Sequence, residues 1–229
     1  SVDELMAQAC EQLRLKPVEG SFAGDIVLTP DSLGDFLGMM DGVYLGSYAM
    51  VSGSSPWKDK LGSTVISPLI TIRSEPVGSA IDAGYSYTGD GFRAENCVII
   101  DKGMLKYFTL GLYASNKTGK SRCPSGGGAI SMDGGTQSRA DIIKGVKKGI
   151  LLGRFSGGNP SDNGDFSGVA KNSYLIENGQ IVRPVSETML AGNLATLFES
   201  VSAVSKERVD FGSSILPWIR TGGIHISGS

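Results

Sequence analysis

The sequence contains few of the residues that build metal centres, disulfide frameworks or membrane spans. It has one histidine, His225, so a zinc site made of several imidazoles is excluded. Its three cysteines, Cys10, Cys97 and Cys123, are far apart and lack metal-ligand spacing, which favours reduced thiols. No run approaches the roughly 18 apolar residues of a membrane helix, and the acidic, amphipathic N-terminal stretch does not resemble a signal peptide. We therefore expect a soluble, cytoplasmic protein without a membrane partner.

A charge excess of either sign is also missing. Lys and Arg together number 21 and Asp and Glu 23, which gives a formal net charge of −2. Nucleic-acid-binding domains usually present a strongly basic surface. We therefore expect no nucleic acid among the partners.

Glycine, in contrast, is abundant, with 33 residues in a chain of 229. That is about twice the average share, and the glycines are scattered through turns without a fixed period. This distribution is typical of a loop-rich β architecture. No Pro- or Ser-rich linker divides the chain, so we expect a single domain over residues 1–229.

Apolar periodicity predicts an α+β fold with a mainly antiparallel, curved or barrel-like β-sheet and a few peripheral helices. Ser138 is the expected N-cap of one helix and Gly149 its expected C-terminal cap. Helices are expected at residues 2–13, 32–43, 57–61 and 138–148. Extended segments are expected at residues 25–28, 65–72, 215–219 and 224–226.

Two segments have the pattern of a β-hairpin, a strand, a tight turn and a returning strand. One turns at Lys102-Gly103 and the other at Asn178-Gly179. Asn and Gly tolerate the positive φ that short hairpin turns require. We expect both hairpins to lie in the main sheet system.

Four ordered pieces around the second hairpin resemble the C-terminal domain of the TldD/PmbA family, which forms peptide-maturing metallopeptidase complexes once called modulators of DNA gyrase. Residues 66–72, 98–107 and 118–119 resemble further family motifs, and residues 44–61 resemble its PmbA branch, also called TldE. The four pieces are Gly164-Asp165-Phe166-Ser167-Gly168, Ile176-Glu177-Asn178-Gly179, Pro184-Val185 and Ala191-Gly192-Asn193. Because members of this family are about twice as long, the resemblance implies that the N-terminal half is absent from this chain.

The resemblance also locates the positions of the family's zinc ligands. Its catalytic branch carries H-E-x-x-x-H on a helix and a cysteine near the C-terminus. Here the corresponding residues 36–42 read Phe-Leu-Gly-Met-Met-Asp-Gly, and residues 211–215 read Phe-Gly-Ser-Ser-Ile. All three ligand positions lack a suitable side chain. We therefore expect no catalytic, cofactor-binding or metal-binding residue in this chain, and zinc in a partner subunit.

A basic loop is the candidate for contacts with a peptide or partner. Residues 114–121 formally match a relaxed phosphate-binding loop, but Pro124 and the glycines at 126–128 exclude the helix that such a loop needs. The segment is interpreted instead as a flexible loop, residues 116–128, without apolar anchors. Its basic side chains are the candidate contacts: Lys117, Lys120 and Arg122.

Two functions follow as hypotheses. In the first, the chain is the C-terminal domain of a PmbA/TldE-like, non-catalytic subunit that pairs with a TldD-like zinc-bearing subunit, or with itself, and acts on an extended peptide. In the second, it is an independent hydrolase whose thiol or carboxylate site is assembled only in the fold. The candidate groups for that site are Cys123, Asp133, Asp162, Asp165 and Glu177.

The empty ligand positions generate a first prediction. The purified chain should hold far less than about one zinc per molecule, because a zinc site needs three or four N, S or O ligands. Elemental analysis after dialysis measures this directly. A stoichiometric, tightly held zinc would contradict the assignment to the branch without a zinc motif.

Overall fold

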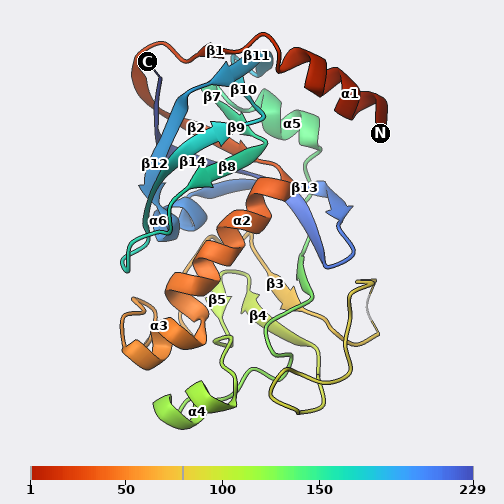
Figure 1. Cartoon of the computed structure of the whole chain (residues 1–229), viewed down its shortest axis with the longest axis vertical. Helices are drawn as coiled ribbons and strands as arrows, with labels where there is room; N and C mark the ends of the chain where they lie inside the picture. Colours follow the sequence, from red (N-terminus) through yellow and green to blue (C-terminus); the bar gives the residue numbers. More distant parts are fainter. Residues whose placement is uncertain (1, 79, 229) are drawn as a thin grey trace.

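The computed structural model describes residues 2–78 and 80–228 (Figure 1). Its helices are α1 Val2–Glu11, α2 Pro30–Met40, α3 Ser47–Ser52, α4 Leu112–Thr118, α5 Arg139–Lys144 and α6 Leu194–Glu199, and a π-helical turn, η1 Asp41–Leu45, continues α2. Its strands are β1 Lys16–Pro17, β2 Ser21–Leu28, β3 Ile72–Ser74, β4 Cys97–Asp101, β5 Met104–Leu105, β6 Ile130–Met132, β7 Lys148–Leu152, β8 Arg154–Gly157, β9 Asp165–Lys171, β10 Ser173–Glu177, β11 Gln180–Ser186, β12 Thr188–Asn193, β13 Val201–Asp210 and β14 Ser214–Ser227.

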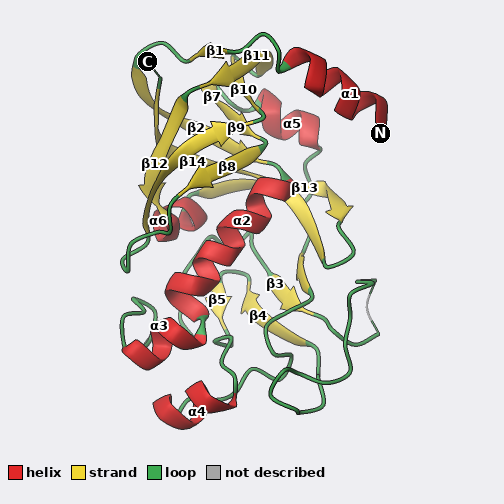
Figure 2. Cartoon of the chain, viewed as in Figure 1, coloured by secondary structure: helices red, strands yellow, loops and turns green. Residues whose placement is uncertain are grey.

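The strands form one open, branched sheet. Its main path runs β1-β11-β10-β7-β2-β14-β6-β3-β4-β5, and β13, β12, β9 and β8 branch from β14. Among the described pairings, β1–β11, β2–β7 and β6–β14 are parallel and the others are antiparallel. Figure 2 shows α1 and α5 beside the upper strands, α3 and α4 at the lower end, and α2 across the middle, between the upper strands and β3–β5. The expected α+β fold, mainly antiparallel with peripheral helices, is confirmed.

Strand β14 is the longest and links the parts of the sheet. Its residues from Ile219 onward pair with β2 on one edge, while β13 and β12 occupy the other edge. Its first residues pair with β6, which leads to β3 and β4. At its far end, Ser227 is paired with Ser21, the first residue of β2. A single strand thus connects the upper sheet in Figure 1 to the lower part that holds β3, β4 and β5.

Helix α2 follows β2 directly and packs against the core. Thr29 caps it and Pro30 takes the first turn, where the missing amide costs nothing. Leu33 and Phe36 are fully buried. The Phe36 ring lies 5.1 Å from that of Phe155 and 5.2 Å from that of Phe166, which fixes the helix against β8 and β9. The side of α2 that faces away from Leu33 and Phe36 carries Gly34 and Gly38, which line open space.

Both predicted hairpins are present, with turns of positive φ at both central residues. Lys102 and Gly103 have φ values of 45° and 80°, and Asn178 and Gly179 have 49° and 75°. This is the pattern of a type I′ turn, whose twist matches that of the flanking strands. The Asn178 and Gly179 amides donate to the carbonyls of Lys147 and Val146, so this turn is docked just after α5.

Several predicted boundaries were wrong. Helix α5 ends at Lys144 with Gly145 as its cap, and Gly149 lies inside strand β7, because residues 148–152 pair with both β2 and β10. Residues 57–61 form turns, not a helix, and the extended segment 65–72 is a strand only from Ile72, since Pro68 interrupts it. The two expected C-terminal strands are one strand, β14, with a bulge near Gly222-Gly223.

No helix in residues 2–78 and 80–228 combines the length and apolar character needed to cross a membrane.

The docked hairpin turn generates a second prediction. A Cβ at Gly179 would lie 2.6 Å from the Lys144 carbonyl oxygen, whereas one at Gly53, also at positive φ, would meet nothing within 4 Å. Gly53→Ala should therefore lower the free energy of unfolding by about 1 kcal/mol, because only the strain of the left-handed backbone opposes it. Gly179→Ala should lower the free energy of unfolding by about 1–3 kcal/mol more, because its methyl group also clashes. Equal losses of unfolding free energy in urea would contradict the docking of this turn.

Candidate functional site

A cavity lies beneath α2 where two distant segments meet. Its volume is about 310 Å³. The end of α2 supplies Leu37 and Met40, and the turn into β14 with the start of that strand supplies Ser213 and Leu216. The structure thus brings together the two segments, residues 36–42 and 211–215, in which the sequence resemblance placed the metal ligands. The floor comes from β3, β4 and the start of β6 with the residue before it, namely Ile72, Ile99, Ile130 and Ala129.

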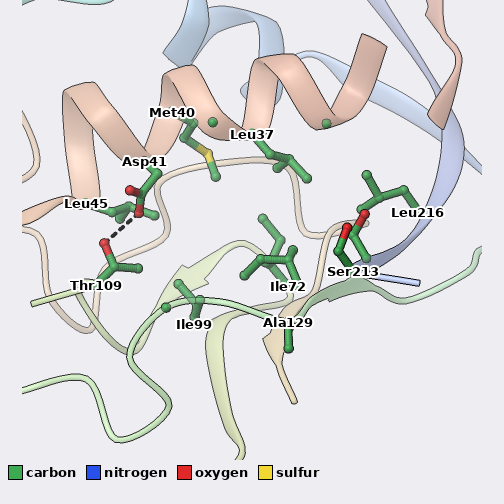
Figure 3. A pocket seen from close by; sticks show the side chains of 15 residues that line it. Leu37, Met40, Asp41, Leu45, Ile72, Ile99, Thr109, Ala129, Ser213 and Leu216 are labelled. Atoms are coloured by element: carbon green, nitrogen blue, oxygen red, sulfur yellow. Dashed lines mark hydrogen bonds between the residues drawn. The ribbon is translucent and has the colours of Figure 1, made fainter. Parts of the chain in front are cut away.

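The lining is mainly apolar, with polar groups at the two ends. Figure 3 shows Asp41 and Thr109 at one end and Ser213 at the other, with aliphatic side chains between them. Such a cavity suits an apolar side chain or small apolar group, oriented by the few polar atoms at its ends.

Among the described residues that line this cavity, Asp41 is the only one with an ionisable side chain. The Thr109 hydroxyl donates to its Oδ1 at 2.5 Å, from a position 68 residues further along the chain. Burial among apolar groups raises the pKa of Asp41, and the hydrogen bond from Thr109 opposes that rise only in part. Asp41 also begins the π-helical turn η1, and its carbonyl accepts from the Gly46 amide at 2.7 Å. Such turns frequently occur at functional sites.

The donor set of the cavity does not fit zinc. Asp41 offers one carboxylate, and the remaining polar side chains are the hydroxyls of Thr109, Ser213 and Ser214. Within the described residues, no group of three or more His, Cys, Asp or Glu side chains is close enough to hold a metal ion. His225 is exposed on β14, where it pairs with Ala23 of β2. These polar atoms can orient a bound group, but they do not make up the three or four ligands of a zinc site.

A second hollow lies on the other side of α2. Its volume is about 650 Å³, and it is lined by Tyr48, Asn159, Pro160 and Asp162, among others. Gly34 and Gly38 line both hollows. A Cβ at Gly38 would meet no atom within 4 Å. The helix backbone is therefore the wall between the two spaces.

The basic loop differs from its prediction in two respects, since its first residues are helical and it has a buried anchor. Lys117 belongs to α4 and is exposed, while Arg122 lies 4.2 Å from the Phe92 ring centre and 3.4 Å from the Asp90 carboxylate. Lys120 lies over the Phe108 ring at 5.5 Å. The expectation that the loop lacks apolar anchors is wrong, because Cys123 is fully buried and behaves as a small apolar residue. The helix ends at Thr118, so no helix follows the lysine of the phosphate-loop-like motif.

Three of the five groups proposed for a thiol or carboxylate site have structural partners, while Asp162 and Glu177 line two separate hollows. The sulfur of Cys123 contacts Cys97 and Ser125. Asp133 pairs with Arg73 at 2.8 Å. Asp165 accepts hydrogen bonds from the side chains of Asn163 and Asn193.

Sequence reasoning did not single out Asp41 or Thr109. A lone carboxylate after the apolar residues Met39-Met40 was the available signal for Asp41. Thr109 carries no local signal, because only the fold places it beside residue 41.

The raised pKa of Asp41 generates a third prediction. The folded state holds this proton more tightly, so its stability falls as the pH rises from about 4 through the folded pKa. Asp41→Asn keeps an acceptor for Thr109 and removes the charge. The difference in melting temperature, variant minus wild type, should increase by about 2–4 °C between pH 4 and pH 7. This is the shift expected for a change of roughly 1 kcal/mol in unfolding free energy. The exposed control Asp59→Asn should show no such trend, and a parallel profile for both variants would contradict a buried charge at Asp41.

Known proteins resemble this chain along most of its length. A metalloprotease of Methanocaldococcus jannaschii is 27% identical over 89% of this chain and 48% of its own length. Metalloprotease PmbA of Escherichia coli O157:H7 is 28% identical over 72% of this chain and 38% of its own length. The chain thus spans about half the length, or less, of these relatives.

Solved structures share the fold. The crystal structure of a proposed modulator of DNA gyrase from Bacteroides thetaiotaomicron superposes with a TM-score of 0.90 at 29% identity, over 99% of this chain and 52% of that one. TldE from Thermococcus kodakarensis gives a TM-score of 0.83 at 21% identity, over 99% of this chain and 55% of that one.

A family model covers nearly the whole chain. The model for the PmbA/TldA metallopeptidase C-terminal domain matches residues 21–228. This match begins at the first residue of β2 and ends one residue after β14. The chain belongs to the PmbA/TldA metallopeptidase C-terminal domain family.

Proposed function

We propose that this chain is the C-terminal domain of a PmbA/TldE-like, non-catalytic subunit of a TldD/TldE-type metallopeptidase complex. In this proposal the zinc resides in a TldD-like partner subunit, and the complex hydrolyses peptides during their maturation. The chain acts in the cytoplasm, in keeping with its three free cysteines.

The observation that carries this proposal is the chemistry of the cavity beneath α2. The two segments in which the family's zinc ligands would lie meet there, and they bring Leu37, Gly38, Asp41 and Ser213 instead of imidazoles and a thiolate. Without a metal, the site has no group that can activate water at neutral pH by the route this family implies. The same residues form an apolar space with polar ends, which suits binding.

The ligand we propose for this cavity is an apolar side chain of an extended peptide. A volume of about 310 Å³ lies at the lower end of the range for small-ligand sites. Gly34 and Gly38 leave the helix wall without side chains, so a peptide backbone can approach it closely.

We further propose that Lys117, Lys120 and Arg122 contact the peptide or the partner subunit. The segment that carries them continues to Gly127 and Ala129, which line the cavity. Lys117 is exposed, and Lys120 and Arg122 are half-buried over aromatic rings. Their charges thus lie on the part of the chain that leads into the binding space.

Reconstitution tests the proposal and is the fourth prediction. The chain, co-expressed with a TldD-like subunit that carries H-E-x-x-x-H, should co-purify with it and with about one zinc per pair. Peptide hydrolysis should require both subunits and should disappear when the glutamate of the partner's motif is replaced. Hydrolysis by this chain alone, or a stable homodimer that excludes the zinc-bearing subunit, would overturn the proposal.

A graded pair of variants tests the cavity in that complex. Gly38→Leu should fill the space beside α2 and reduce peptide turnover about tenfold or more, a loss of roughly 1.4 kcal/mol in transition-state stabilisation. Gly38→Ala is the matched control, since it adds one methyl group where nothing lies within 4 Å and favours the helix by about 1 kcal/mol. Unchanged turnover with Gly38→Leu would show that the cavity takes no part in peptide binding.

Replacing Lys117, Lys120 and Arg122 together by Ala should weaken co-purification or turnover.

A further inference from the structure

Two of the three cysteines lie side by side although 26 residues separate them in sequence. The Sγ atoms of Cys97 and Cys123 are 3.9 Å apart. The Ser125 hydroxyl lies 3.3 Å from the Cys97 sulfur and 3.1 Å from the Cys123 sulfur. Neither Cys97 nor Cys123 has metal-ligand spacing, and the described residues around them form no metal cluster. A thiol pair at this distance has one evident chemistry, the formation of a disulfide.

We propose that Cys97 and Cys123 form a reversible disulfide through exchange with a low-molecular-weight disulfide such as glutathione disulfide. The two sulfurs must approach from 3.9 Å to about 2.05 Å. Cys97 lies at the start of strand β4, and Cys123 lies in the loop that follows α4. The approach of the two sulfurs therefore brings the loop and the strand together at this point.

The different exposure of the two thiols indicates that Cys97 reacts first. Cys97 is half-buried and Cys123 is fully buried, so Cys97 is the more accessible of the two. The hydrogen bond from the Cys97 thiol lowers the pKa of Cys123, and the same bond, together with burial, raises the pKa of Cys97. The first proton is therefore lost from Cys123. Attack by Cys97 requires the remaining proton to move from Cys97 to Cys123.

The exchange balances in two steps. The Cys97 thiolate attacks glutathione disulfide, forms a mixed disulfide and releases one glutathione thiolate. The Cys123 thiolate then attacks the Cys97 sulfur, forms the internal S–S bond and releases the second glutathione thiolate. Overall, two protein thiols are oxidised and one glutathione disulfide is reduced to two glutathione molecules. Excess glutathione reverses both steps.

The bond would join two segments that line the cavity beneath α2. Ile99, two residues after Cys97 in β4, lines it, and so do Gly127 and Ala129, shortly after Cys123. The reduced loop is already held at two points, since the Cys123 amide donates to the Leu110 carbonyl at 2.8 Å and the Tyr85 hydroxyl donates to the Ser125 carbonyl at 2.7 Å. Oxidation adds a covalent tie between the floor and this loop.

The fifth prediction is tested in a Cys10→Ser background, because Cys10 is exposed and would react separately. The protein is equilibrated in buffers of varied glutathione to glutathione disulfide ratio. It is then trapped with N-ethylmaleimide in denaturant, which exposes the buried Cys123, and weighed by intact mass spectrometry. Under oxidising ratios it should lose two hydrogen atoms and bind no maleimide. Peptide mapping should then show residues 97 and 123 cross-linked, and added glutathione should restore two reactive thiols.

Single replacements identify the role of each cysteine. Cys123→Ser in the same background should accumulate the glutathione adduct on Cys97, because no second thiol can displace it. Cys97→Ser should leave Cys123 free of glutathione, since that thiol is buried. The background protein itself decides the proposal, so a variant that folds poorly leaves the test intact. Two free thiols at every ratio, or a stable adduct on Cys97 with Cys123 present, would overturn it.

Discussion

The pairing of β14 with β2 is the interaction on which the rest of the molecule depends. It aligns β2 so that α2, which follows directly, crosses over the start of β14. The other edge of β14 holds β13 and β12, and its first residues hold β6 and, through it, β3 and β4. The cavity exists because α2 is fixed above and β3 and β4 are fixed below. Loss of this pairing would separate its roof from its floor.

The cavity beneath α2 joins two segments that lie far apart in sequence. The segments at residues 36–42 and 211–215 meet there around apolar side chains, and Asp41 is the single ionisable group among the described residues that line it. A site of this kind gains its affinity from apolar burial and its orientation from a few polar atoms. Because the residues sit on a helix and at a strand start, the position of the site follows from the fold and not from its chemistry.

Local patterns predicted the parts of the fold that depend on local forces. The turns at Lys102-Gly103 and Asn178-Gly179 were recognised because their conformation is set by the turn residues themselves. The end of α5 was placed too late, since pairing of residues 148–152 with two other strands outweighed helical periodicity. The contacts of Asp41 with Thr109, and of Cys97 with Cys123, join residues far apart in sequence. No pattern of spacing within a single element contains that information.

The pairing of Ser21 with Ser227 has a consequence for the protein as a component of larger assemblies. The first strand of the matched region and its last strand end side by side, so the chain enters and leaves this unit at one point on its surface. A unit with adjacent ends can be attached to, or placed within, another polypeptide without pulling its own termini apart. A segment joined to either end of this unit would be attached at the same corner of the sheet.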